Sequence, residues 1–545
     1  MGANIGLAPL ITQLREDLAF RRIGSGLEAL ETNRSLLAGL DPTHENAAAL
    51  VGIVAQWVDI GFAGPELLSD LLSRFPKHSR ACLRLLDYVN LRMAEGLLAM
   101  REEEFDQATR HLQFVQSMED EIPDMALLAI SSFWMGRCLR KEGRYDDALS
   151  YTAKGKALAL KLGYDKMAAV MQVMESWLAF QKGKLKEAST ILREAERALS
   201  DTDDFVSRGN IQSAYGRIAR RQGRYDRALE HFESSLLEYK RSDPQHMHLA
   251  RALVNTAYVK RLIALRTQNA IDERLAHRRS GTSTNGAESA RSDRAHIQQL
   301  RVEAVAQLSE ALSIYQRHHN HRGIGSVYVN YSYLHLDEGD LDRASSDAAE
   351  AFRHGEEKRD YILMARARTV QCMIENARLE EQIDEDPDRR AQMAHDFAHD
   401  AVECAKQTQN RRLLSRALVW EGLTFCNSQD REAARRCCDA AIALLRPAGP
   451  QFGWEDLEAL KTRLSHSGQV EAALQEWSKG LTHDKTFQQI TEEFANILIP
   501  RVWEREGRKI SRVAVRLSIS PKKVRRILHS AGLVREGRER TAVHP

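Results

Sequence analysis

The sequence predicts an all-α protein, a solenoid of helical hairpins followed by a small helix-turn-helix domain. A short pattern ending in alanine returns at a fixed interval of about 40 residues, and apolar residues within each repeat recur at three- and four-residue steps. The last fifty residues leave this period and become strongly basic. A chain of 545 residues is also too long for one compact core, so several domains or a repeat array are expected.

The repeat is marked by an alanine that stands near the start of the second helix of each expected hairpin. The marker alanines are Ala108, Ala148, Ala188, Ala228, Ala304, Ala344, Ala394 and Ala434. The first four are evenly spaced, and the same spacing returns within each of the last two pairs. A fixed period of this size is typical of a solenoid, in which each hairpin buries its apolar face against its neighbours.

Small residues accompany these alanines at two fixed places. Twelve residues before the alanine stand Gly96, Gly136, Ser176, Gly216, Ser332 and Gly422. The turn between the two helices holds Gly143, Gly183, Gly223, Gly339 and Gly468. Small side chains within the helices predict a close approach of the two antiparallel helices, and glycine in the turn suits a helix C-cap.

This pattern resembles the tetratricopeptide repeat (TPR) over roughly residues 84–480. The signature occurs as Gly136…Gly143-Arg-Tyr-Asp-Asp-Ala148 and as Gly216…Gly223-Arg-Tyr-Asp-Arg-Ala228. The usual period is about 34 residues, so the longer period of this chain implies longer helices. The longer repeat is similar to that of bacterial regulators that bind peptides, proteins or small effectors. The resemblance implies a right-handed superhelix with a concave binding groove.

The spacing also predicts the domain borders. We expect degenerate or capping hairpins at 1–83, repeats at 84–265 and 301–480, a disordered insertion at 266–300, a helix-turn-helix domain at 487–535 and a disordered tail at 536–545. The insertion is assigned from the unusually wide gap between Ala228 and Ala304 and from its Gly/Ser/Thr-rich centre, which offers nothing apolar to bury. Helices 251–265 and 301–317 are expected to pair across it.

Two fixed offsets, eleven and eight residues before the alanines of three consecutive repeats, select candidate groove residues. They are Arg137, Trp177 and Arg217 at the first offset and Arg140, Phe180 and Arg220 at the second. Guanidinium groups bind carboxylates bidentately and stack on aromatic rings, so an acidic peptide or a C-terminal carboxylate is the expected ligand. The alternative is that the arginines form a solvated face while Trp177 and Phe180 belong to the core.

The end of the chain predicts a separate module. From Arg501 onward there are thirteen Lys/Arg and four Asp/Glu, a balance of +9, whereas the total is +2 and the preceding residues therefore sum to −7. A helix at 487–506 precedes two short helices at 510–517 and 521–528, with Ser520 as N-cap and Pro521 at the first helical position. The alternatives are a helical cap on the solenoid or a disordered basic tail.

These last residues resemble the Fis-type helix-turn-helix at the end of bacterial enhancer-binding activators. The matching residues are Ser511, Arg512, Ala514, Leu517, Ile519, Ser520, Ala531, Gly532 and Leu533. The main departure is Ser518, where that family usually has glycine. The resemblance implies that residues 510–533 bind DNA. Lys522, Lys523, Arg525 and Arg526 would contact phosphates and bases, and Arg512 and Arg516 would lie near the backbone.

Other classes of function have little support in the sequence. There is no Gly-x-x-x-x-Gly-Lys-Ser/Thr loop for ATP and no nucleophile–base or paired-carboxylate arrangement, so we expect no enzyme and no cofactor. His318, His319 and His321 are expected in a solvated turn without metal, and Cys437 and Cys438 as buried thiols. The seven cysteines and the lack of an apolar membrane-length run favour a cytoplasmic protein without a membrane partner.

The sequence thus predicts a transcriptional regulator whose solenoid binds a peptide, protein or small effector and whose end binds DNA. A homodimer is a further expectation, because one motif this small binds weakly by itself. The alternative is a TPR scaffold or adaptor in which the basic tail docks to a partner protein.

Overall fold

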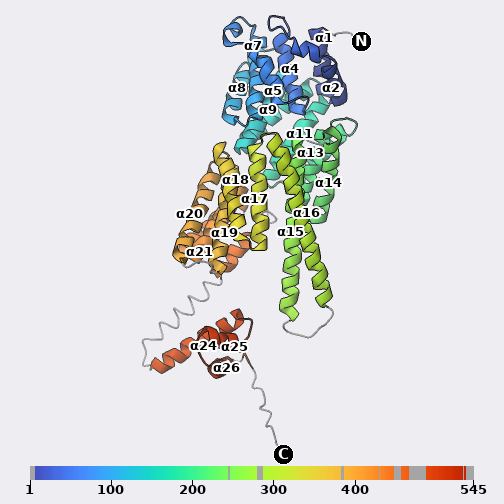
Figure 1. The fold of residues 1–545 in the computed structure, drawn as a ribbon. Coiled ribbons are helices and arrows are strands. Elements are labelled where there is room, and N and C mark those ends of the chain that lie inside the picture. Colours follow the sequence, from blue (N-terminus) through green and yellow to red (C-terminus); the bar gives the residue numbers. More distant parts are fainter. Residues whose placement is uncertain are drawn as a thin grey trace, which may run out of the picture. The chain divides into compact units, whose positions relative to one another are not determined.

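The computed structural model describes residues 6–243, 246–278, 286–381, 386–428, 430–446, 456–465, 487–531 and 533–534. Helices are the only regular elements in these ranges (Figure 1). The chain divides into two compact units, Met1–Thr462 and Arg463–Pro545. None of the helices searched in the described ranges is both long and apolar enough to cross a bilayer. The predicted all-α, TPR-like solenoid of helical hairpins is confirmed.

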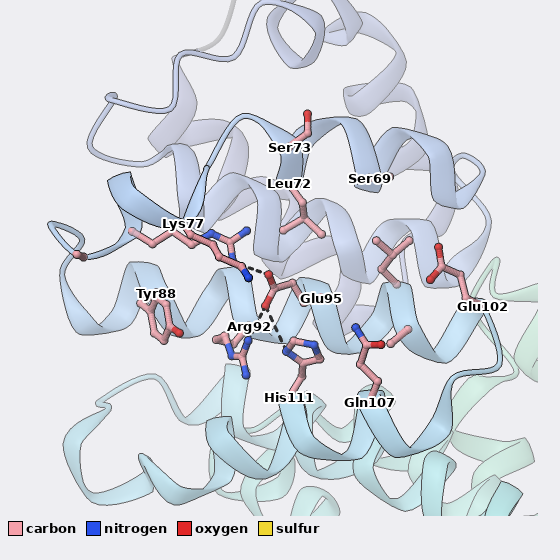
Figure 2. Close-up of a pocket in the computed structure, with 14 residues that line it drawn as sticks. Ser69, Leu72, Ser73, Lys77, Tyr88, Arg92, Glu95, Glu102, Gln107 and His111 are labelled. Carbon is pink, nitrogen blue, oxygen red and sulfur yellow. Dashed lines mark hydrogen bonds and ion pairs between the residues drawn. The ribbon is translucent and has the colours of Figure 1, made fainter.

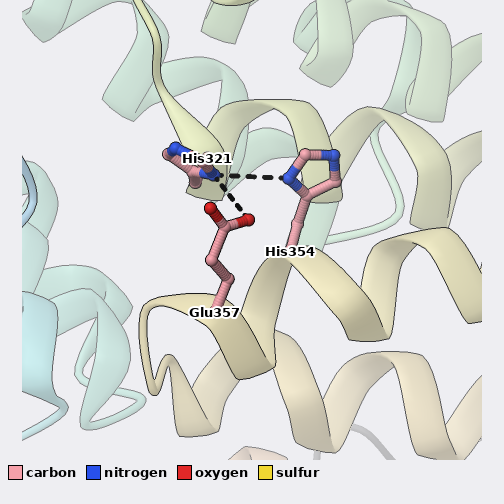
Figure 3. A group of neighbouring side chains, drawn as sticks. All are labelled: His321, His354 and Glu357. Atoms are coloured by element: carbon pink, nitrogen blue, oxygen red, sulfur yellow. Dashed lines mark hydrogen bonds and ion pairs between the residues drawn. The ribbon is translucent and has the colours of Figure 1, made fainter.

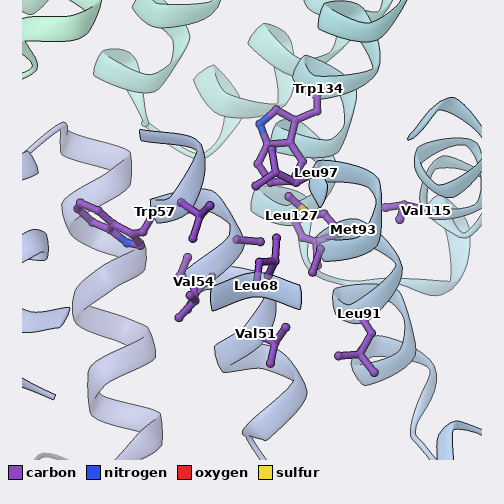
Figure 4. Packing of buried hydrophobic residues seen from close by; sticks show 14 of the residues in the cluster. Val51, Val54, Trp57, Leu68, Leu91, Met93, Leu97, Val115, Leu127 and Trp134 are labelled. Carbon is purple, nitrogen blue, oxygen red and sulfur yellow. The ribbon is translucent and has the colours of Figure 1, made fainter. Parts of the chain in front are cut away.

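The first unit begins with helices of unequal length rather than regular pairs. They are α1 (Leu7–Phe20), α2 (Ile23–Thr32), α3 (Arg34–Ala38), α4 (Ala47–Ile60), α5 (Pro65–Ser73) and α6 (Lys77–Arg80). Their apolar side chains join those of the first repeats in one continuous core, in which Trp57, Leu68 and Trp134 are fully or almost fully buried (Figure 4). Gly26 makes room for Trp57, because a Cβ at residue 26 would lie 2.0 Å from the indole ring.

Regular hairpins follow. They pair α7 (Leu85–Arg101) with α8 (Phe105–Ser117), α9 (Met125–Glu142) with α10 (Tyr145–Lys161), α11 (Asp165–Gln181) with α12 (Leu185–Leu199), α13 (Phe205–Arg221) with α14 (Tyr225–Ser242), α15 (Met247–Arg278) with α16 (Gly286–Arg317), α17 (His321–Glu338) with α18 (Leu341–Glu357), α19 (Tyr361–Glu381) with α20 (Pro387–Lys406), and α21 (Arg411–Asn427) with α22 (Arg431–Leu445). A 3₁₀ turn, η1 (Glu119–Glu121), precedes α9. Residues 456–465 are also helical.

The eight marker alanines lie where the two helices of each hairpin touch. All eight are fully buried. Where the facing small residue is serine, its hydroxyl donates to the carbonyl of the marker alanine, from Ser176 to Ala188 at 2.9 Å and from Ser332 to Ala344 at 2.7 Å. The small residue therefore does more than leave space, because in these two hairpins it also bonds one helix to the other.

The turn glycines behave as predicted. Gly143, Gly183, Gly223 and Gly339 have φ between 71° and 84°, the left-handed region in which side chains cost energy. Gly468 lies outside the described residues.

The predicted disordered insertion at 266–300 is wrong over most of its length. Helix α15 continues to Arg278 and α16 already begins at Gly286, so the two form a long antiparallel pair that projects beyond its neighbours (Figure 1). Ala264, Ile271, Ile297 and Leu300 form a small apolar seam between them. The polar centre of the segment dominates its composition and hides this seam. Residues 279–285 lie outside the described residues.

Turns far apart in sequence meet and close the solenoid on itself. The amide of Gln409 donates to the carbonyl of Gly143 at 2.9 Å, and its side-chain oxygen accepts from the amide of Asp146. The side chain of Asn410 donates to the hydroxyl of Tyr145. A neighbouring contact joins Lys358 to Glu104 at 2.8 Å. These bonds connect early repeats of the unit directly to late ones.

The second unit contains α24 (Phe487–Arg505), α25 (Ile510–Arg516) and α26 (Pro521–Ser530). Helix α24 continues through Pro500, where the sequence predicts a break or kink. The predicted apolar wedge is confirmed. Ala514, Val524, Ile527 and Leu528 are buried together with Ile499, Trp503 and Val513, and Leu517 and Ile519 pack against them.

The turn before α26 has the predicted cap. The Ser520 hydroxyl accepts from the amide of Lys523 at 3.2 Å, and Pro521 occupies the first turn of the helix. Ser518 has φ of 50°, which explains why the resembling family usually has glycine at that position. Residues 466–486 and the predicted tail at 536–545 lie outside the described residues.

We expect Gly216→Ala to destabilise the repeat unit by about 1 kcal/mol. In an exposed helix this change would be favourable by about 1 kcal/mol, but the added Cβ would lie 2.7 to 2.9 Å from three ring carbons of the fully buried Phe232. Overpacking of this kind costs about 1–3 kcal/mol. Urea unfolding followed by circular dichroism measures the difference. Ser234→Ala, on the exposed side of α14, is the control and should leave stability unchanged or raise it. A gain for Gly216→Ala would show that the close approach is not a constraint.

Candidate functional site

The main candidate site is a cavity of about 200 Å³ inside the repeat unit. It lies between α1 and α4 on one side and the first helices of successive hairpins, α9, α11, α13 and α15, on the other. The structure brings four of the six predicted groove residues into its lining. They are Arg137, Arg140, Trp177 and Arg217. The rest of the wall is largely apolar, with methionine, valine and phenylalanine side chains.

The charged lining of this cavity is strongly one-sided. It consists of Arg21, Arg137, Arg140, Arg217 and Arg251 with a single carboxylate, that of Asp59. Arg21 is neutralised by Asp204 at 2.6 Å, and Arg137 by Asp59. In the part of the chain that the structure describes, the other three arginines have no carboxylate within ion-pair distance. We call Arg140, Arg217 and Arg251 the chamber arginines.

Neutral partners hold the chamber arginines in place. The guanidinium of Arg140 lies over the indole of Trp177, 4.8 Å from the ring centroid. Arg217 donates through Nε to the carbonyl of Ser213 at 3.2 Å, and Arg251 donates to the side-chain oxygen of Asn210 at 2.6 Å. These contacts fix direction without cancelling charge, so donor capacity remains for an anion.

The electrostatics express the same excess. Burial, with Arg251 nearby, lowers the pKa of both Arg140 and Arg217 to about 9. Burial and Arg251 also hold the pKa of His248 well below its usual range. A guanidinium keeps its proton at neutral pH, so these shifts report positive charge that the surroundings do not compensate. A bound carboxylate or phosphate would compensate it.

A second cavity of about 270 Å³ shares Arg137 and Arg140 with the first. It adds Arg101 and Lys141 to the basic lining, with Glu103 as a facing carboxylate. Burial and the neighbouring Arg322 lower the pKa of Lys141 to about 7. The basic character therefore extends along the interior of the unit beyond the first chamber.

The two remaining predicted groove residues lie elsewhere. Phe180 is 5% exposed and packs among apolar side chains of α11, α12 and α13, with the guanidinium of Arg221 3.9 Å from its ring centroid. For Phe180 the alternative of a core side chain is right, and its assignment to the groove is wrong. Arg220 does not line the cavity. It donates to Asn255 at 3.2 Å and lies 5.0 Å from the ring of Tyr258.

Arg220 belongs to a further basic–aromatic cluster that the sequence analysis missed. Arg261 lies 4.5 Å and Arg416 5.4 Å from the ring centroid of Tyr333. Although burial raises the pKa of Tyr258, the charges of Arg416, Arg261 and Arg220 lower it overall. Tyr333 stands at the first offset, eleven residues before Ala344, so extending that offset to this repeat would have found it.

Arg251 was missed for a different reason. The repeat that contains it has its marker alanine beyond the long α15–α16 extension, at Ala304. Counting back from that alanine lands within the extension rather than on the wall of the chamber.

A third cavity, of about 1000 Å³, lies between α5, α6, α7 and α8. Glu95 stands at its centre and contacts Arg80, Arg92 and His111 (Figure 2). Burial acts to raise the pKa of Glu95, but His111 and Arg80 outweigh it and lower that pKa to about 2. Here the central carboxylate already balances the basic groups, so this cavity lacks the charge excess of the first.

In the second unit the structure places all six predicted DNA-contact residues on the surface. Lys522, Lys523, Arg525, Arg526, Arg512 and Arg516 are exposed. Arg516 contacts Glu506 at 2.6 Å and Arg526 contacts Glu492 at 3.3 Å. No carboxylate of the described residues lies within ion-pair distance of the other four. Helix α26 thus presents a basic face opposite its buried apolar face.

His318 and His319 are exposed in the turn between α16 and α17, as predicted. Cys437 and Cys438 are buried, also as predicted.

No protein-family model and no curated protein matches the sequence. Solved structures resemble the chain at low identity. A Rap protein complexed with Competence and Sporulation Factor is 11% identical with a TM-score of 0.47, covering 82% of this chain and 99% of that one. An IFIT1 monomeric mutant with Gppp-AAAA gives 11% and 0.46, covering 86% and 91%. The apo quorum sensor NprR from B. thuringiensis gives 12% and 0.41, covering 80% and 98%. The similarity is confined to the helical architecture.

We expect Arg217→Gln to raise the thermal unfolding midpoint of the repeat unit, because it removes a buried charge that lacks a carboxylate partner. Arg261→Gln is the matched control. Arg261 forms a buried two-point ion pair with Asp337, at 2.5 and 2.7 Å, so its loss should cost about 3–5 kcal/mol. Differential scanning calorimetry compares the two. Equal destabilisation would mean that Arg217 is compensated as well as Arg261.

We expect the stability contributed by Glu95 to disappear between about pH 4.5 and pH 2. The folded-state pKa is lowered, so the contribution is fully present above the unfolded pKa and is lost as pH falls through the folded value. Its upper limit is about 3 kcal/mol. Urea unfolding of Glu95→Gln and wild type should therefore differ at pH 6 and converge near pH 2. Glu102→Gln, in the same cavity but exposed, is the control. A difference independent of pH would refute the assignment.

Proposed function

We propose that this chain is a DNA-binding regulator. In this proposal the repeat unit binds an anionic ligand, a peptide or small effector, in the chamber that the arginines line, and α26 binds DNA. The observation that carries it is the basic face of α26, because a capped helix with four exposed cations beside a buried apolar face suits a major groove. The proposed activity is binding rather than catalysis.

The DNA half of the proposal assigns roles to the exposed cations. Lys522, Lys523 and Arg525 extend from the first turns of α26, the end from which a recognition helix reaches base edges. Arg526 and Arg512 would contact phosphates. Arg516, held by Glu506, would stabilise the unit or meet a phosphate after exchanging that partner.

The ligand half rests on the three chamber arginines. Three guanidinium groups without carboxylate partners in a partly apolar cavity favour a ligand that combines an anionic group with apolar surface. An acidic peptide or a peptide C-terminal carboxylate has both properties. Trp177, stacked on Arg140, would supply an apolar contact beside the charge.

The proposed link between the two activities is the curvature of the solenoid. A ligand that neutralises the chamber would change the repulsion between successive repeats, and in a homodimer this would alter the spacing of two DNA-binding units. The competing function is a scaffold or adaptor that uses the same chamber and docks its basic end on a protein. The chamber by itself suits both functions, so DNA binding decides between them.

We expect Lys523→Ala combined with Arg526→Ala to weaken DNA binding and to reduce the slope of log K against log salt by about 2, roughly one for each lost phosphate contact. Fluorescence anisotropy with labelled duplexes between low and physiological salt measures both quantities.

Arg435→Ala with Arg436→Ala, exposed on α22 of the repeat unit, is the matched control with the same change of charge. It should leave affinity and slope unchanged. If the two double variants behave alike, or if wild type does not bind DNA even at low salt, the adaptor function is the better account.

A further inference from the structure

Two histidines and a glutamate meet between α17 and α18, outside the cavities described above (Figure 3). His321 is the first residue of α17, and His354 and Glu357 lie three residues apart near the end of α18. Their ligand atoms all lie within 4.8 Å of one another. The sequence analysis treated His321 as part of a solvated turn, because its partners come from the far end of the next helix along the chain.

The distances match those between the ligands of a tetrahedral metal ion. His321 Nδ1 and His354 Nδ1 are 3.4 Å apart, and His321 Nδ1 lies 3.3 Å from Glu357 Oε2. Ligands about 2.0–2.1 Å from a tetrahedral zinc ion are separated from each other by about 3.3 Å. For a hydrogen bond between two imidazoles 3.4 Å is long, so direct bonding explains this geometry poorly.

The surroundings hold His354 as a metal ligand would be held. Its other ring nitrogen, Nε2, lies 3.3 Å from the carboxylate of Glu350, an arrangement that places the proton on Nε2 and leaves the lone pair on Nδ1. His354 is 8% exposed, and its ring stacks on that of Tyr328. Burial and Arg353 lower the pKa of His354, which keeps the imidazole in its neutral, ligating form.

One cation competes for this place. Arg353 lies 3.6 Å from Glu357 and 3.3 Å from His354 Nε2. It is paired more closely with Glu350, at 2.6 and 3.0 Å. Its partner Glu350 can therefore retain it when a metal ion takes Glu357.

We propose that His321, His354 and Glu357 form a binding site for Zn²⁺ or a similar divalent transition-metal ion, with solvent as the fourth ligand. Two imidazole nitrogens and one carboxylate select such ions over Mg²⁺ or Ca²⁺, which prefer oxygen. The site would fix the first turn of α17. In that turn Asn320 and the amide of Arg322 donate to Glu103 of a distant repeat, at 3.0 and 3.3 Å. The metal ion would thus stabilise the closure of the solenoid.

The test uses the metal-free full-length protein, with Co²⁺ as a spectroscopic probe and Zn²⁺ as competitor. We expect one tight site with the absorption of tetrahedral cobalt and no thiolate-to-metal band, and we expect zinc to raise the thermal unfolding midpoint. His321→Asn and Glu357→Gln should each abolish the tight site and the thermal shift. Glu350→Gln should weaken binding by roughly tenfold, as for other groups that orient a ligating histidine.

His395→Asn is the control, since His395 and His399 form a separate histidine pair on α20. It should bind as wild type does. Circular dichroism of His321→Asn, whose side chain is partly exposed, shows whether a loss of binding reflects misfolding, and Glu357→Gln gives an independent result on an exposed residue. A thiolate band, unchanged binding by both His321→Asn and Glu357→Gln, loss of the tight site in His395→Asn, or no tight site in wild type would overturn the proposal.

Discussion

The close approach of the two helices at each marker alanine is the contact on which the rest of the repeat unit depends. Every one of these alanines is fully buried, and the facing residue is small enough for the backbones to approach or, as serine, bonds to the facing carbonyl. This contact sets the rotation of each first helix about its axis. Residues at one offset then face the same way, which is why Arg137, Trp177 and Arg217 line one cavity.

Convergence of these residues creates the electrostatic property of the chamber. Three arginines are held by an indole, a carbonyl and an amide, and burial lowers the pKa of two of them. An interior selected for stability alone would pair or replace such charges, as the Arg261–Asp337 pair does. Local violations of this rule are expected at functional sites. The excess charge is therefore the strongest structural sign of an anionic ligand.

The sequence was informative where the physics is local. The marker alanines, the turn glycines with positive φ and the Ser520 cap each follow from a few neighbouring residues, and each is confirmed. The offset rule also found four lining residues of the chamber. It failed for Phe180, because one offset points inward in some repeats and toward the next hairpin in others, depending on how large the facing side chains are.

Features that depend on distant parts of the chain could not be predicted in this way. The bond from Gln409 to Gly143 depends on how far each repeat rotates and rises, summed over several repeats, and no local pattern records that sum. The contact of His321 with His354 depends on the packing of two neighbouring helices. The apolar seam of α15 and α16 was concealed by the polar residues around it.

The central claim, that the repeat unit senses a ligand and the second unit recognises DNA, is tested most directly by selecting genomic fragments. The full-length protein and a chain ending at Gly480 are each mixed with fragmented genomic DNA, and the bound fragments are sequenced. The account predicts a shared sequence motif for the full-length protein and none for the shortened chain. A motif retained by the shortened chain, or no enrichment by the full-length protein, would contradict it.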